Sequence, residues 1–142
     1  MPDLDPRFAA GTVALDRWRL CHVLLMNDAT YPWLMLVPLR PGIVEIGDLA
    51  PDQRVRLIQE IAEASAILRA ITHCHRINVA ALGNVVPLLH VHVIARFTSD
   101  PAWPKPVWGF GPAVPYAADA LAGFKRRYED ERTRLSRDGM SA

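Results

Sequence analysis

The chain has 142 residues, and 16 lysine and arginine residues against 15 aspartate and glutamate residues give a formal net charge of +1 at pH 7. Hydrophobic residues make up 51% of the chain and charged residues 22%, which is typical of one globular domain and excludes a disordered chain. The near-neutral charge favours neither nucleic acid nor a membrane as a partner, and the N-terminus lacks the pattern of a secretory signal, so we expect a soluble cytoplasmic protein.

The first half of the chain predicts a hairpin followed by a long helix. Residues 19–26 and 31–38 are rich in strand formers and flank the polar turn 27–30, which favours an antiparallel pair. Pro51 opens a helix over 51–72, because proline is favoured at the first helical position. We expect Glu60 and Glu63 to lie off an apolar stripe made of Val55, Ile58, Ile61, Ala62, Ser65, Leu68 and Ile71.

The second half predicts two more strands and a second main helix. Residues 77–82 and 88–97 are rich in strand formers and are separated by a Gly83-Asn84 turn. Residues 100–109 are rich in proline and hold two tryptophans, which indicates a lid over a pocket or a subunit contact. Residues 116–135 form a helix whose charge run predicts a solvated face. Short loops between neighbouring strands favour an α+β fold with an antiparallel sheet.

Two histidines in the last predicted strand are the strongest candidates for function. Side chains alternate across a strand, so His90 and His92 share one face while Leu89, Val91 and Val93 point into the core. Histidine is the side chain that titrates near neutral pH, so the pair offers a nucleophile, a proton donor or a metal ligand. A purely structural role for the two side chains is the simplest alternative.

A metal site needs more ligands than this pair supplies. The further candidates are His22, His73, Cys74 and His75, but the histidines at 73 and 75 follow the end of the long helix, where cationic side chains complement the dipole. The two cysteines are far apart in sequence and form no paired motif. We therefore expect no metal, and we prefer chemistry on a phosphate ester. In such a reaction one neutral imidazole attacks phosphorus, and the neighbouring imidazole donates a hydrogen bond to the phosphoryl oxygens.

The segment Leu88-Leu89-His90-Val91-His92-Val93-Ile94 resembles the motif of the histidine triad (HIT) family, in which three histidines alternate with apolar residues. Leu88 stands where the family has its first histidine. The resemblance covers about residues 10–110, including the hairpin, the long helix and the segment 77–84. It implies a HIT-like α+β fold with a sheet of about five strands and two main helices. Residues 1–110 would form the HIT-like domain, and 111–142 a C-terminal helix packed on it.

The resemblance implies a nucleotide-binding hydrolase or transferase, for example a phosphoramidase, with His90 as the nucleophile and His92 bonded to the α-phosphate. It places the remaining nucleotide contacts on Asn27 or Asp28 for the ribose hydroxyls, on Asn78 and Asn84 for the phosphate or leaving group, and on Leu25 and Ile46 for the base. The expected partners are a purine nucleotide or its conjugate and a second copy in a homodimer. The chemistry needs no cofactor, although Mg²⁺ would accompany a polyphosphate.

Two positions depart from the family pattern. Leu88 removes a polar side chain beside the nucleophile, and Val85 replaces a serine that in many members helps to protonate the leaving group. Two alternatives to the enzyme are therefore kept: a nucleotide sensor without turnover, and a metal-binding module that uses the His-x-His pair.

Overall fold

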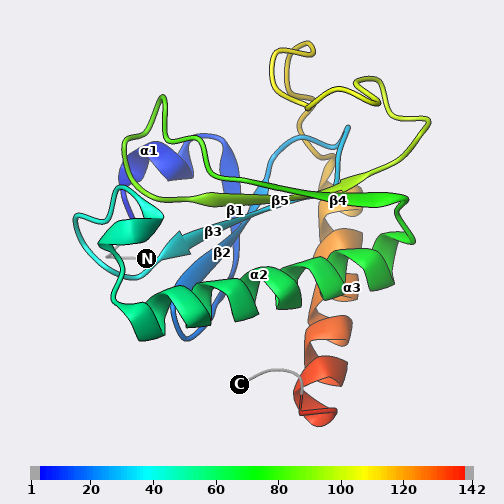
Figure 1. Cartoon of the computed structure of the whole chain (residues 1–142). Coiled ribbons are helices and arrows are strands. Elements are labelled where there is room, and N and C mark those ends of the chain that lie inside the picture. The colour runs from blue at the N-terminus through cyan, green and yellow to red at the C-terminus, as the bar shows by residue number, and fades with distance from the viewer. Residues whose placement is uncertain (1–3, 140–142) are drawn as a thin grey trace.

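The computed structural model describes residues 4–139, in which one sheet is flanked by helices and loops (Figure 1). The elements are α1 (Pro6–Ala9), β1 (Thr12–Arg17), β2 (Cys21–Met26), β3 (Trp33–Pro38), η1 (Ile46–Asp48), α2 (Pro51–Thr72), β4 (Arg76–Ala80), β5 (Val91–Arg96) and α3 (Ala118–Arg137). The strands have the order β1-β2-β3-β5-β4, and all neighbouring pairs are antiparallel. The predicted α+β class with a five-stranded antiparallel sheet and two main helices is confirmed.

The elements differ from the sequence expectation mainly near the N-terminus. Helix α2 has the predicted bounds, and the four predicted strands are present but are shorter by one to four residues. Strand β1, the short helix α1 and the turn η1 were not predicted individually. Strand β1 has a bulge between Ala14 and Asp16 and is only partly buried, which weakens the alternation that identifies a strand.

The two faces of the sheet have different neighbours. One face supplies Val23, Leu34 and Val91 to a core that includes Leu57 and Ile67 of α2. The opposite face carries two smaller apolar clusters, one that includes Phe8 of α1 and one that includes Ala102 and Val107 of the segment between β5 and α3. Figure 1 shows α2 on one side of the sheet and α1 on the other. The second face is therefore the one available for a site.

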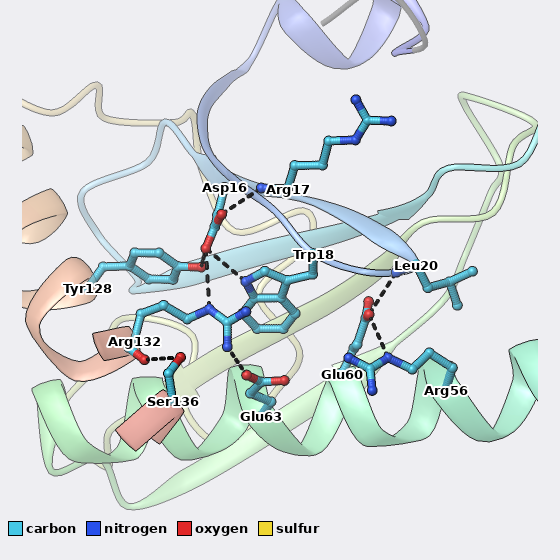
Figure 2. Close-up of polar contacts among 10 residues, drawn as sticks. All are labelled: Asp16, Arg17, Trp18, Leu20, Arg56, Glu60, Glu63, Tyr128, Arg132 and Ser136. Atoms are coloured by element: carbon cyan, nitrogen blue, oxygen red, sulfur yellow. Dashed lines mark hydrogen bonds and ion pairs between the residues drawn. The ribbon is translucent and has the colours of Figure 1, made fainter. Parts of the chain in front are cut away.

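The buried side of α2 agrees only in part with the predicted one: Leu68 is buried, and Ile61 and Ile71 pack against the core. Val55 and Ile58 are 60% and 64% exposed, whereas Glu60 is fully buried and Glu63 is 8% exposed. The reason is a set of charge-assisted hydrogen bonds: Glu60 accepts from the backbone N–H of Leu20 at 2.8 Å and from the Arg56 side chain (Figure 2). It also accepts from the backbone N–H of Cys21 at 3.0 Å. A carboxylate that satisfies this many donors is stable in the core, so Glu60 lies on the buried side of the helix.

Helix α3 is attached to the sheet by a polar cluster as well as by apolar packing. Arg132 lies between Asp16 and Glu63 and forms ion pairs with both, with its guanidinium 4.7 Å from the centre of the Trp18 ring (Figure 2). The hydroxyl of Tyr128 donates to Asp16 at 3.1 Å. The apolar residues of this helix join the core that α2 and the sheet share: Phe124, Tyr128 and Leu135. The described part of 111–142 thus packs on the same core.

Candidate active site

His90 and His92 lie together at the start of β5. Their ring centres are 5.1 Å apart, and the side chains are 8% and 4% exposed. Leu89, Val91 and Val93 belong to the core on the other face, so the predicted alternation of side chains is present. The two imidazoles are therefore held side by side, with little freedom, on the face of the sheet opposite α2.

The main chain orients the ring of His90. Its Nδ1 lies 2.7 Å from the carbonyl oxygen of Leu88, and a carbonyl oxygen only accepts, so Nδ1 carries the proton. In the neutral ring Nε2 then has a free lone pair. The Phe8 ring meets the imidazole edge-on, with centres 5.0 Å apart. His90 is thus held in the tautomer that a nitrogen nucleophile requires.

His92 is held in the opposite tautomer. The indole Nε1 of Trp33 donates to Nδ1 of His92 at 3.0 Å, and because an indole N–H only donates, the neutral ring carries its proton on Nε2. Burial, together with the neighbouring His90, lowers the pKa of His92 to about 4 from its usual 6.5. The pair therefore offers one acceptor nitrogen on His90 and one N–H donor on His92.

Both histidines open onto a cavity of about 380 Å³, within the size range of small-molecule sites. Its walls are mostly apolar and come from distant segments: Phe8, Met26, Met35, Val86 and Trp108. Arg7 also borders the cavity and is paired with Asp5 at 2.8 Å. The cavity therefore suits a planar apolar group, with an anionic group near Arg7.

Besides the two histidines, one of the four asparagine and aspartate residues predicted to contact a nucleotide lines this cavity. Asn84 does, in the turn where Gly83 has a φ of +67°. Asn78 does not, and its amide oxygen accepts from Arg96 at 2.8 Å. Arg96 is 1% exposed and also binds Asp100, so Asn78 helps to satisfy a buried cation. The structure thus gives Asn78 a structural partner, and its contact with the phosphate or leaving group stays a prediction.

Asn27 and Asp28 hold the segment that leads into α3. Asn27 Oδ1 accepts from the backbone N–H of Tyr116 at 2.9 Å. Asp28 Oδ1 accepts from the N–H groups of Thr30 and Val114, at 3.1 and 3.2 Å. Neither residue lines the histidine cavity. The ribose contact inferred from the resemblance remains a prediction, and these bonds indicate a structural task.

The two residues suggested for the base are also elsewhere. Leu25 is fully buried in the core on the α2 face, and Ile46 is 45% exposed and lines a different cavity. Met26, the next residue after Leu25, faces the histidine cavity, because neighbouring side chains on a strand point to opposite faces. If a base binds in this cavity, Met26 is the residue of this strand segment that would contact it, and the base contacts of Leu25 and Ile46 stay a prediction.

Of the two tryptophans in the proline-rich loop, one covers the site and one anchors the loop. The Trp108 ring is 5.0 Å from the ring of His92 and 5.6 Å from that of Trp33. Trp103 instead stacks near the Arg96 guanidinium, 5.7 Å from its ring centre. These contacts favour the lid interpretation of the loop for Trp108.

The described residues contain no group of three or more histidine, cysteine, aspartate and glutamate side chains placed to hold a metal ion. His75 packs edge-on against Trp103, and His22 is buried on β2, so neither joins the histidine pair. Among these same residues no helix is long and apolar enough to cross a membrane.

Sequence reasoning missed two contributors to the site. One is Trp33, which the sequence predicts only as part of a strand. The other is helix α1 with Arg7 and Phe8, a segment for which the sequence predicts no element. The sequence does hold one signal for Trp33: it is two residues before Met35 on the same strand, so both side chains point to the same face. Which strand lies beside it is a property of the sheet order, and the local sequence does not contain it.

The family model of the HIT domain matches residues 12–99 of the chain. The chain is similar to a crystal structure of a histidine triad protein from Marinobacter aquaeolei VT8, with 46% identity, a TM-score of 0.89 and coverage of 93% of this chain and 96% of that one. Histidine triad proteins from Bradyrhizobium japonicum and Sinorhizobium meliloti 1021 match with 44% and 42% identity and a TM-score of 0.88 each. Both cover 90% of this chain, and 96% and 95% of their own lengths. No curated protein matches the chain.

Proposed function

The chain belongs to the histidine triad family, and we propose that it is a nucleotide-binding hydrolase or transferase. Its substrates are nucleoside monophosphate esters, phosphoramidates or anhydrides, and the reaction passes through a nucleotidyl group on His90. The observation that carries this proposal is the complementary pair of tautomers: a lone pair on His90 Nε2 beside an N–H on His92 Nε2.

In the first step His90 Nε2 attacks the α-phosphorus. A P–N bond forms, the bond from phosphorus to the leaving group breaks, and the bonding pair departs with the leaving group. The ring becomes an imidazolium with its Nδ1 proton already directed at the Leu88 carbonyl, 2.7 Å away. This hydrogen bond strengthens as the ring becomes positive, so it stabilises the transition state more than the ground state.

In the second step water, or another acceptor, attacks the same phosphorus. The P–N bond breaks, its electron pair returns to Nε2 of His90, and the attacking group loses a proton to solvent. In both steps the Nε2–H of His92 donates to a phosphoryl oxygen that gains charge. The proposed chemistry uses no cofactor, and Mg²⁺ is expected only as the companion of a polyphosphate substrate.

The apolar cavity supports a purine as the group bound beside the phosphate. Phe8, Met26 and Met35 offer flat and adaptable surface for a base, and Arg7 offers a cation near the anionic part. Asn84 is the polar residue that we propose contacts the phosphate or the leaving group, since it is the predicted one that borders the cavity.

Release of AMP from adenosine 5′-phosphoramidate by metal-stripped protein tests the proposal, with His90→Ala as the comparison. Turnover that is lost in His90→Ala supports the nucleotidyl enzyme. Thermal stabilisation by AMP without turnover of this substrate, or of a nucleotide ester with a nitrophenolate leaving group, supports a nucleotide sensor that uses the same cavity. Neither turnover nor AMP binding would reject the nucleotide proposal and leave the metal-binding alternative, which metal analysis of the protein as purified would test.

We also propose that the protein acts as a homodimer. Strand β4 ends the sheet and is paired with β5 alone among the described residues, and its Val79 is 48% exposed. The outer face of α2 exposes Val55 and Ile58. An unpaired strand edge and exposed apolar side chains are features that a second copy would cover.

A further inference from the structure

The partner of His92 is an indole from a neighbouring strand. Trp33 lies opposite Ile94 in the β3–β5 pairing, and Met35 lies opposite His92, so Trp33 and His92 are diagonal neighbours on one face. A tryptophan side chain is long enough to reach across that diagonal. Trp33 is only 6% exposed, and its ring packs against Tyr31 and Ile94, so its position does not depend on the ligand.

Among the described residues, the surroundings of His92 that border the cavity include no carboxylate that would stabilise a second proton on its ring. The rings around it belong to Trp33, His90 and Trp108, with centres 5.0 to 5.5 Å away. Met35 lies opposite it on β3. The ionisable groups that border the cavity are Arg7, His90 and His92, and no carboxylate is among them. Nothing on these elements therefore favours the imidazolium form of His92.

We propose that Trp33 is a positioning residue that holds His92 as a neutral Nε2–H donor, so that the site releases leaving groups without protonating them. The catalytic part of this statement rests on the proposed function, whereas the tautomer does not. A neutral imidazole that gave up its Nε2 proton would become an imidazolate, which is far too basic an anion to form in a buried site. His92 therefore donates a hydrogen bond and keeps its proton.

This arrangement has a consequence for the substrate class. The leaving group must depart with its electron pair and take a proton from solvent, which favours weakly basic leaving groups such as phosphates and phenolates. Val85, at the cavity wall and 91% exposed, has no proton to offer. Burial already lowers the pKa of His92 to about 4, which agrees with a ring that stays neutral over the working range.

Nitrogen-15 NMR of the imidazoles tests the tautomer directly, without substrate. In the wild-type protein we expect His92 to be protonated on Nε2 and unprotonated on Nδ1 down to about pH 5. Wild-type His92 that carries its proton on Nδ1, or that becomes cationic near pH 6.5, would overturn the proposal, and this measurement needs no variant to fold.

Trp33→Phe removes the N–H and keeps an aromatic ring. We expect a mixture of His92 tautomers and a rise of its pKa by about one unit, since the lost hydrogen bond is worth roughly tenfold in the equilibrium. Trp108→Phe is the matched control. It shortens a second indole that packs against the His92 ring but forms no hydrogen bond with it. An equal shift in the two variants would mean that bulk alone sets the tautomer, and would also overturn the proposal.

Kinetics then test the catalytic part. A substrate with a nitrophenolate leaving group should react roughly three- to tenfold more slowly in Trp33→Phe. Adenosine 5′-phosphoramidate should lose less, because the raised pKa increases the fraction of cationic His92, and this form can protonate an amine leaving group. A uniform loss on both substrates would contradict the claim about leaving groups. If the tautomer shifts as expected while the wild type turns over neither substrate, the proposed function fails and the positioning role of Trp33 stands.

Discussion

The backbone carbonyl of Leu88 holds Nδ1 of His90 at 2.7 Å, so the residue that departs from the family motif still orients the proposed nucleophile. The contact uses the main chain, and any residue at position 88 supplies it. The side chain of Leu88 instead packs against the apolar cluster of Phe8, Leu24 and Met35.

Leu88→Ala should therefore leave kcat/KM for a nucleotidyl substrate within about threefold of the wild type, because the carbonyl remains in place. The measurement is steady-state AMP release, with His90→Ala as the inactive comparison. A loss of a hundredfold or more in folded Leu88→Ala would show that the side chain itself orients the ring.

The buried His92 should make the protein less stable in mild acid. Its pKa is about 4 in the folded protein against 6.5 in the unfolded chain, so between these values the unfolded chain binds the extra proton. The contribution of neutral His92 to the free energy of unfolding is thus fully present above about pH 6.5 and falls as the pH drops towards 4. The loss is roughly 2 kcal/mol between pH 7 and pH 5. Urea unfolding of the wild type and of His92→Asn at both pH values measures the contribution of His92 to this pH dependence, since asparagine does not titrate. Equal pH dependence in the two proteins would contradict it.

Asp28 should contribute to stability by holding the segment that precedes α3. Asp28→Ala removes the acceptor for the N–H groups of Thr30 and Val114, and we expect a loss of about 1–3 kcal/mol of unfolding free energy. Asp28→Asn is the control, because it keeps Oδ1 as an acceptor and should be milder. A raised KM for a ribonucleotide at unchanged stability would instead support the ribose contact inferred from the resemblance.

The Arg96–Asp100 pair should be the most sensitive ion pair in the described chain. Its side chains are 1% and 5% exposed, and the hydrogen bond from Arg96 holds the pKa of Asp100 below its usual value. The pair therefore contributes above about pH 4 and is lost only as the pH falls through that lowered pKa. Asp100→Asn should cost about 3 kcal/mol, because it leaves Arg96 buried without its counter-charge.

Asp138→Asn is the matched control for this experiment. Arg134 and Asp138, at the end of α3, are also four residues apart and 2.8 Å from each other, but both side chains are at least half exposed. We expect no measurable change in denaturant unfolding, because solvent screens an exposed pair. Similar effects of the two substitutions would show that burial does not decide the contribution of these pairs.

The proposed homodimer predicts that Ile58→Glu weakens self-association. Ile58 is 64% exposed on α2, and a charge there opposes burial against a second copy. Sedimentation velocity over a range of concentrations measures the effect. Val114→Glu serves as the control, since Val114 is 53% exposed on the segment before α3. A wild-type protein that sediments as a monomer throughout would reject the dimer.

The sequence alone determined the elements whose signals are local. Alternation in residues 88–97 placed His90 and His92 on one face, and the proline at position 51 began α2 at the residue where it starts. The order of strand and helix signals, with short loops, was enough for the α+β class. These properties depend on spacing along the chain, which a single segment contains.

Which side chains come into contact depends on the tertiary structure. Hydrophobic periodicity placed Glu60 outside the core, but the backbone donors of Leu20 and Cys21 bring its carboxylate inside. Trp33 reaches His92 because β3 and β5 are neighbours, and Asn78 reaches Arg96 because β4 and β5 are. Hydrogen bonds between residues distant in sequence depend on strand order and register, and these are set by the packing of the whole chain.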